Sequence, residues 1–152
     1  MTMPELPSDE LLDRFESAAN AAWNRGELDA LDEFFADDVA VHDVPTGQTY
    51  GNLDEFKGWI SGVRQGFPDF TLDEEATSYF AADDRLVSQW VFTGTHDGTL
   101  PEIEVEPTNQ PVELAGVTVY EMTDGVVTEA WWYFDMMGLL SQLGLVPEEL
   151  PA

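Results

Sequence analysis

The amino-acid sequence predicts an α+β fold, in which helices pack on one curved antiparallel sheet. Apolar residues recur at helical spacing through the first third of the chain, whereas apolar and polar residues alternate from about residue 70 onwards. Helices followed by a run of strands are typical of this class, because the sheet buries one face against the helices. The 152 residues fit a single domain over 1–152, of which we expect residues 1–8 to be flexible.

Three helices are expected before the alternating region begins. Ser8 is a good N-cap for the first helix, and Gly26 is a stop signal at its end. Asn52 caps the third helix, and Glu55 follows three residues later, which is the spacing of a capping box. The helices are expected at 9–25, 28–35 and 52–65.

Five strands and a last helix account for the rest of the chain. Turn signals separate the later strands at Asp83-Asp84 and Asp124-Gly125. Residues 46–51 and 96–109 are expected to be loops. The strands are expected at 39–43, 70–79, 85–95, 110–122 and 126–134, and the last helix at 136–144.

The turn at Asp124-Gly125 leaves the register of its hairpin open. A two-residue loop would place Glu121 on the face opposite Asp135. A three-residue loop, with a left-handed Gly125 as a bulge, would place Val119 and Glu121 on the same face as Asp135. Two carboxylates that share an apolar face would raise each other's proton affinity.

The charge of the chain is extreme, with 31 acidic and 5 basic residues and a net charge of −26. Nucleic acid and anionic membrane surfaces are not expected as partners, because both are bound by clusters of Lys and Arg. The acidic residues are spread along the chain, which favours a protein of a halophile, whose charges are screened by salt. An ordinary acidic protein is the alternative.

Several other classes of protein are also disfavoured by the sequence. The chain has no cysteine, so we expect no disulfide, no thiol catalysis and no Cys-ligated zinc. Residues 1–9 lack the pattern of a signal peptide, and no stretch is long enough for a transmembrane helix. A soluble, cytoplasmic protein is therefore expected.

Asp135 is the main candidate for chemistry. It follows the aromatic run 131–134, where water should be scarce. A carboxylate in such surroundings tends to have a raised pKa and can exchange protons near neutral pH. The alternative is that Asp135 only caps the helix that begins at Met136.

His42 and His96 are the only histidines, and they lack the spacing of a metal site. Either can act as a proton-transfer or hydrogen-bonding partner, or can be a structural residue. No nucleotide-binding fingerprint and no Ser–His–Asp arrangement is present, so we expect neither a metal nor an organic cofactor.

Aromatic residues on the strands can line a pocket, form the core or form a subunit interface. In the last strand Trp131 and Tyr133 share a face with Asp135. The side chains predicted to contact a substrate are Trp23, Phe67, Trp90, Val119, Trp131 and Tyr133.

Several segments, in their order and spacing, resemble the SnoaL-like polyketide cyclases, also called ester cyclases. They are the segments 41–43 (VHD), 67–69 (FPD), 94–98 (GTHDG), 124–131 (DGVVTEAW) and 140–144 (LSQLG), together with Asp135. The similarity spans about residues 11–145.

This resemblance implies a nuclear-transport-factor-2-like cone, in which three helices pack on a strongly bent sheet around a deep pocket. It also implies a homodimer that pairs through the sheet face, and catalysis without a cofactor. Asp135 would then be the acid/base of an intramolecular aldol closure, taking a proton α to a carbonyl. Val119 and Glu121 stand where the aromatic polyketide cyclases carry polar partners, among them a histidine.

The leading hypothesis is a cofactor-independent acid/base enzyme, of the cyclase, isomerase or lyase type. Its substrate would be a small, largely apolar carbonyl compound, with Asp135, His42, His96 and Glu121 as candidate catalytic residues. The alternatives are a binding domain without catalysis and a dimerisation module of the same fold.

Overall fold

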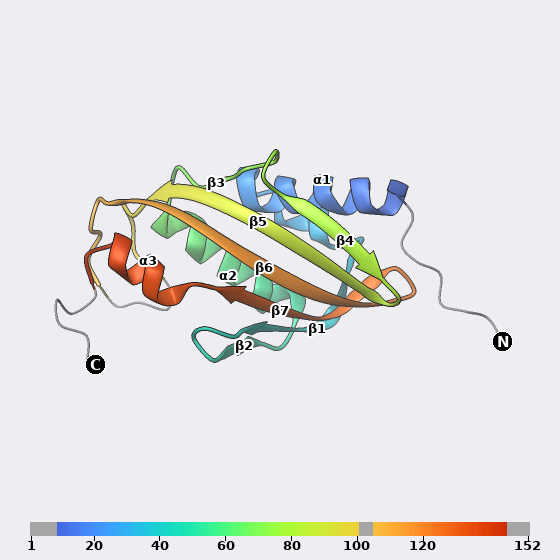
Figure 1. Ribbon diagram of the computed structural model, residues 1–152. Helices are drawn as coiled ribbons and strands as arrows, with labels where there is room; N and C mark the ends of the chain where they lie inside the picture. Colours follow the sequence, from blue (N-terminus) through green and yellow to red (C-terminus); the bar gives the residue numbers. More distant parts are fainter. Residues whose placement is uncertain (1–8, 101–104, 146–152) are drawn as a thin grey trace, which may run out of the picture.

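A computed structural model of the protein describes residues 9–100 and 105–145. Helices α1 (Asp9–Arg25) and α2 (Leu53–Gly66) lie behind a curved sheet, and α3 (Met136–Gln142) follows the last strand (Figure 1). This arrangement confirms the predicted α+β class. None of the described helices is both long enough and apolar enough to cross a membrane.

The sheet has seven strands in the order β2-β1-β7-β6-β5-β3, and β4 also pairs with β5. All described pairings are antiparallel except that of β1 with β7, which is parallel, so the sheet is mixed. The strands are β1 (Phe35–Asp43), β2 (Gln48–Tyr50), β3 (Thr71–Leu72), β4 (Ser78–Ala82), β5 (Arg85–Thr95), β6 (Pro111–Thr123) and β7 (Val126–Phe134).

The long helices and strands lie close to where the sequence places them, and the helix cap at Asn52 is confirmed. The Asn52 side chain accepts a hydrogen bond of 2.8 Å from the Glu55 backbone N–H. The Glu55 carboxylate accepts in turn from the backbone N–H of Gly51, at 2.6 Å, one residue earlier than in a standard capping box. The predicted cap at Ser8 lies outside the described residues.

The short elements are where the sequence-based prediction is wrong. The expected helix at 28–35 is only a 3₁₀ turn, η1 (Leu28–Leu31), because the chain then enters β1. There the Phe34 carbonyl accepts a hydrogen bond of 2.8 Å from the Val127 backbone N–H. The expected loop at 46–51 contains β2, which pairs with β1.

The expected strand at 70–79 is divided into β3 and β4. Between them the Asp73 carboxylate accepts hydrogen bonds from the backbone N–H groups of Glu75 and Ala76, at 3.0 and 3.2 Å. Such a side-chain turn competes with the sheet ladder, so pairing stops at β3 and resumes at β4.

The β6–β7 hairpin combines the two alternatives that the sequence leaves open. Its turn has two residues, Asp124 and Gly125, with φ of 53° and 80°. One extra residue, Thr128, then bulges between the pairs Met122–Val127 and Glu121–Glu129. The bulge restores the register of the longer loop, so Glu121 lies on the same face as Trp131 and Tyr133.

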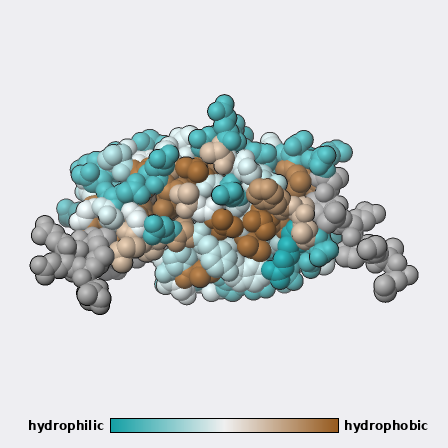
Figure 2. All heavy atoms as spheres, in the orientation of Figure 1, coloured by the Kyte–Doolittle hydropathy of each residue, from teal (hydrophilic) through white to brown (hydrophobic). Residues whose placement is uncertain are grey.

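The two faces of the sheet have different surroundings. Side chains on the inner face are mostly buried against the helices, whereas their neighbours on the outer face are half-buried or exposed. In Figure 2, which shares the orientation of Figure 1, hydrophobic side chains gather near the middle of the face turned toward the viewer. On β5 the inner residues are Leu86, Ser88, Trp90, Phe92 and Gly94.

Candidate functional site

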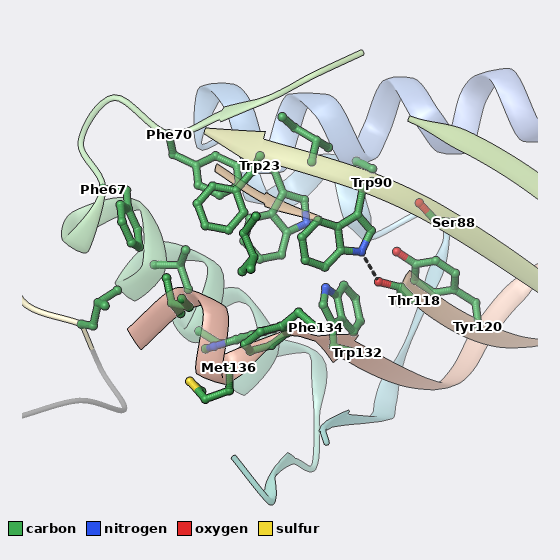
Figure 3. A pocket seen from close by; sticks show the side chains of 18 of the residues that line it. Trp23, Phe67, Phe70, Ser88, Trp90, Thr118, Tyr120, Trp132, Phe134 and Met136 are labelled. Atoms are coloured by element: carbon green, nitrogen blue, oxygen red, sulfur yellow. Dashed lines mark hydrogen bonds between the residues drawn. The ribbon is translucent and has the colours of Figure 1, made fainter. Parts of the chain in front are cut away.

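A cavity of about 100 Å³ lies between the inner face of the sheet and the helices (Figure 3). Residues of α1, α2, α3 and the strands β3 to β7 all contribute to its walls. The aromatic side chains in these walls are Trp23, Trp59, Phe67, Phe70, Tyr79, Trp90, Phe92, Tyr120, Trp132 and Phe134. A concave, aromatic cavity of this kind is the usual form of a small-molecule site.

The indole of Trp90 forms one wall of this cavity, and its neighbours on β6 determine where the ring lies. Trp90 pairs with Gly116, where a Cβ atom would lie only 2.3 Å from Cζ2 of the ring. Glycine is therefore required at this position, because any side chain would displace the indole. Two residues further along β6, Thr118 Oγ1 accepts a hydrogen bond of 2.9 Å from Trp90 Nε1.

Four residues with hydroxyl groups line the cavity, besides the indoles of its tryptophans. Tyr79 on β4, Ser88 on β5 and Thr118 on β6 form one cross-strand row on the inner face. Tyr120 lies two residues beyond Thr118 on the same face. In Figure 3 the hydroxyls of Ser88, Thr118 and Tyr120 gather at one end of the cavity, away from Phe67.

Both tyrosines of this group have raised pKa values. Burial raises the pKa of Tyr79, and the hydrogen bond with Ser88 offsets only part of this effect. Burial, helped by the neighbouring Tyr79, also raises the pKa of Tyr120 well above its usual value of 10.0, against a smaller opposing effect of Thr118. At neutral pH the two phenols are therefore uncharged hydrogen-bonding groups.

The described cavity walls contain no carboxylate and no imidazole. A charged ligand would find no opposite charge there to repay its loss of hydration. The walls therefore favour an uncharged, largely apolar ligand.

Asp135 lies at the rim of the cavity rather than in its wall. Its side chain is exposed, and Oδ1 accepts a hydrogen bond of 2.8 Å from the backbone N–H of Gly138 at the start of α3. The structure thus shows the helix cap that the sequence offers as the alternative role. Its neighbours Phe134 and Met136 both line the cavity.

His42 and Glu121 lie on the outer face of the sheet. His42 Nε2 lies 2.7 Å from Oε2 of Glu129, and its ring stacks on Trp131 with 5.6 Å between centroids. Glu121 pairs across the strands with Glu129 and lies 3.6 Å from the Arg85 guanidinium. The sheet separates both candidates from the cavity.

His96 is fully buried at the end of β5 and does not line the cavity. Its Nδ1 accepts a hydrogen bond of 3.2 Å from the Thr108 backbone N–H, and its Nε2 has no partner among the described residues. The ring packs against Phe67, with 5.8 Å between centroids, and Phe67 separates it from the cavity. His96 thus holds the segment around Thr108 to the end of α2.

Of the side chains predicted to contact a substrate, Trp23, Phe67 and Trp90 line the cavity. Val119, Trp131 and Tyr133 lie on the outer face instead, because the bulge and strand alternation point Trp132 and Phe134 inward. The roles of Trp23, Phe67 and Trp90 in binding stay predictions.

The hydroxyl row was not found from the sequence. Strand alternation could have identified these residues. Ser88 falls on the same face as Leu86, Trp90 and Phe92, which are core residues. Polar residues in step with core residues mark a lined cavity or a buried network. Over 9–100 and 105–145, no three His, Asp or Glu side chains gather in a way that could hold a metal ion.

A bent sheet that encloses an aromatic cavity against helices is the arrangement of the nuclear-transport-factor-2-like fold. The family model of the SnoaL-like polyketide cyclases matches residues 14–143, and the chain belongs to that family. The predicted resemblance is thereby confirmed. A comparison with curated proteins finds no match.

Solved structures with the same fold include proteins of several descriptions. TsrD from Streptomyces laurentii superposes with a TM-score of 0.78 at 17% identity, over 91% of this chain and 98% of TsrD. AclR, a proposed hydroxylase from Streptomyces galilaeus, gives 0.71 at 27% identity, over 93% of this chain and 90% of AclR. IdmH, a proposed polyketide cyclase from Streptomyces antibioticus, gives 0.70 at 24% identity, over 89% of this chain and 99% of IdmH.

The raised pKa of Tyr120 predicts how stability changes in alkaline solution. Above about pH 10 the unfolded chain loses the phenol proton while the folded chain keeps it, so the free energy of unfolding should fall as the pH rises. Tyr120→Phe should remove this part of the loss, about 1.4 kcal/mol per pH unit. Urea denaturation at pH 9, 10 and 11 measures it. Tyr133→Phe, at an exposed position, is the control, and equal losses in both variants would contradict the prediction.

Proposed function

We propose that the protein binds a small, uncharged and largely apolar carbonyl compound in the cavity beneath its sheet. The observation that carries this proposal is the aromatic cavity, whose described walls hold hydroxyl groups but no carboxylate and no imidazole. Family membership supports the proposal, because the SnoaL-like proteins are named for reactions of small molecules.

Two half-buried tryptophans give a matched test of this proposal. Trp23 lines the cavity, whereas Trp131 lies on the outer face. Trp23→Leu should weaken the binding of a small cyclic ketone such as cyclohexanone by about tenfold, because it removes aromatic contact area. Trp131→Leu should leave binding unchanged. Chemical-shift titration measures both, and equal effects of the two substitutions would place the ligand elsewhere.

Catalysis of the cyclase, isomerase or lyase type is a second candidate function, favoured by the place of Asp135 between two cavity-lining residues. Asp135 would take a proton α to the ligand's carbonyl and return one to the oxygen. To do so its carboxylate must leave the Gly138 amide and turn toward the cavity. His96 would act only as a positioning residue behind Phe67, and a role for His42 or Glu121 would be indirect, through the sheet.

Two substitutions at Asp135 separate chemistry from helix capping. Asparagine caps a helix about as well as aspartate, so Asp135→Asn should leave the free energy of unfolding unchanged, whereas Asp135→Ala should lower it by about 1 kcal/mol. If the protein turns over a cyclic ketone, measured as exchange of the α-proton for deuterium by NMR, Asp135→Asn should abolish the exchange. Undiminished exchange in that variant would rule out Asp135 as the acid/base.

AclR, in the same fold, is a proposed hydroxylase, so the fold alone does not name the reaction.

We also propose that a second copy of the chain covers the outer face of the sheet. One cross-strand row there runs through Phe80, Val87, Val119 and Trp131. Phe80 has an exposed fraction of 57%. A continuous apolar row on an exposed sheet face is typical of a subunit interface.

Val119 lies near the centre of this row, so Val119→Glu should convert a dimer to a monomer by placing a carboxylate in the interface. Sedimentation equilibrium in molar KCl measures the mass. The matched control is Thr93→Glu, at an exposed position nearer the far end of β5. A monomeric wild-type chain, or a dimer that survives Val119→Glu, would contradict the proposal.

The charge supports a cytoplasmic protein of a halophile that does not bind nucleic acid. Each of the five basic residues already contacts a carboxylate or a backbone carbonyl. Five positive charges cannot neutralise the 31 acidic residues. The contacts are Arg14–Glu33, Arg25–Glu27, Lys57 with Asp29 and Asp32, Arg64 with the Trp23 carbonyl, and Arg85–Glu121.

Salt must therefore screen the repulsion that remains. The melting temperature should rise by several degrees between about 0.1 M and about 2 M KCl, because the screening length shrinks from about 10 Å to below 3 Å. Scanning calorimetry measures it, and sucrose at equal osmolality controls for nonspecific stabilisation. An equal melting temperature at the two KCl concentrations would refute the proposal that the protein comes from a halophile.

A further inference from the structure

Three contacts fix the position of the Trp90 ring in the cavity wall. Its ring lies directly over Gly116, and its Nε1 donates to the hydroxyl of Thr118 at 2.9 Å, so ring plane and ring edge are both constrained. The indole also stacks on Phe92, with 6.3 Å between centroids and 28° between planes. The side chain is 8% exposed, and Thr118 is fully buried.

Any displacement of the Trp90 ring by a larger ligand would break the bond to Thr118. The indole N–H and the threonine hydroxyl would then both lose a partner in a dry interior, which is costly. Because Thr118 has no exposed surface, its hydroxyl cannot turn to water instead. The ring is therefore a fixed boundary of the cavity rather than a movable one.

The space that this boundary leaves is small. The cavity measures about 100 Å³. An apolar protein cavity of about 150 Å³ holds one benzene molecule, and sites for drug-sized ligands measure about 300–1,000 Å³. A compound of several fused rings would have to displace Trp90 to enter.

We propose that Trp90, positioned by Thr118 and Gly116, is the residue that limits the ligand to about one six-membered ring. The substrate class of the site is then an uncharged monocyclic or short-chain compound with one acceptor oxygen, and not a polycyclic one. This inference rests on the proposed function, since it concerns the same cavity. The acceptor oxygen lies toward the hydroxyls of Tyr79, Ser88 and Tyr120, and the hydrocarbon part toward Phe67 (Figure 3).

Chemical-shift titrations with cyclohexanone, which has one ring, and 1-tetralone, which has two fused rings, test this inference. The wild-type chain should bind cyclohexanone at least tenfold more tightly than 1-tetralone. Trp90→Phe should tighten 1-tetralone binding at least tenfold, because the smaller ring vacates space. Thr118→Val keeps the volume of the side chain but frees the indole, so it should also admit 1-tetralone. Trp131→Phe, on the outer face, should leave the preference unchanged.

The outcomes distinguish this inference from the proposed function. Wild-type binding of 1-tetralone as tight as that of cyclohexanone overturns the inference and leaves the proposed function standing. An unchanged preference in both Trp90→Phe and Thr118→Val overturns the role of Trp90. If neither ketone binds to the wild-type chain or to the variants, the proposed function fails and the inference fails with it. Thr118→Val decides the matter if Trp90→Phe does not fold.

Discussion

The close approach of the Trp90 indole to the backbone of Gly116 is the contact on which the cavity depends. A Cβ at Gly116 would lie 2.3 Å from the ring, so the absence of a side chain on β6 is what lets a large side chain on β5 lie flat. Because Trp90 lies flat, space remains beneath the sheet for a ligand. The hydroxyl of Thr118 then fixes the ring edge, which couples the shape of the cavity to the register of two neighbouring strands.

The same strand register separates the two faces of the sheet into two different surfaces. On β7, Trp132 faces the cavity while Trp131 contacts His42 on the outside. The single extra residue at Thr128 sets this assignment, because without it each side chain beyond the bulge would pair differently with β6. A one-residue irregularity near a turn thus decides which aromatic side chains can meet a ligand.

Much of the fold could be predicted from the sequence, because the longest elements carry the clearest periodicity. In the range 85–95 the large residues Leu86, Trp90 and Phe92 keep one phase, and the range is a strand over its whole length. The break at Asp73 depends on a side-chain hydrogen bond, and the bulge at Thr128 depends on pairing with β6, so neither appears in a periodic pattern. The sequence also does not show which face of β7 turns toward the cavity, since tryptophan occurs on both faces. The cavity walls were therefore predicted only in part, as Trp23, Phe67 and Trp90.

Family membership and cavity chemistry direct attention to different residues. The family resemblance singles out Asp135, whereas the cavity places hydroxyls where a ligand's oxygen would lie. In the folded structure Asp135 Oδ1 accepts a hydrogen bond from the backbone N–H of Gly138, so the carboxylate is directed at α3 and does not line the cavity. Proton abstraction by Asp135 would therefore require the loss of that cap in the reactive state. Binding alone requires no such change, because Tyr79, Ser88 and Tyr120 already lie in the walls of the folded cavity.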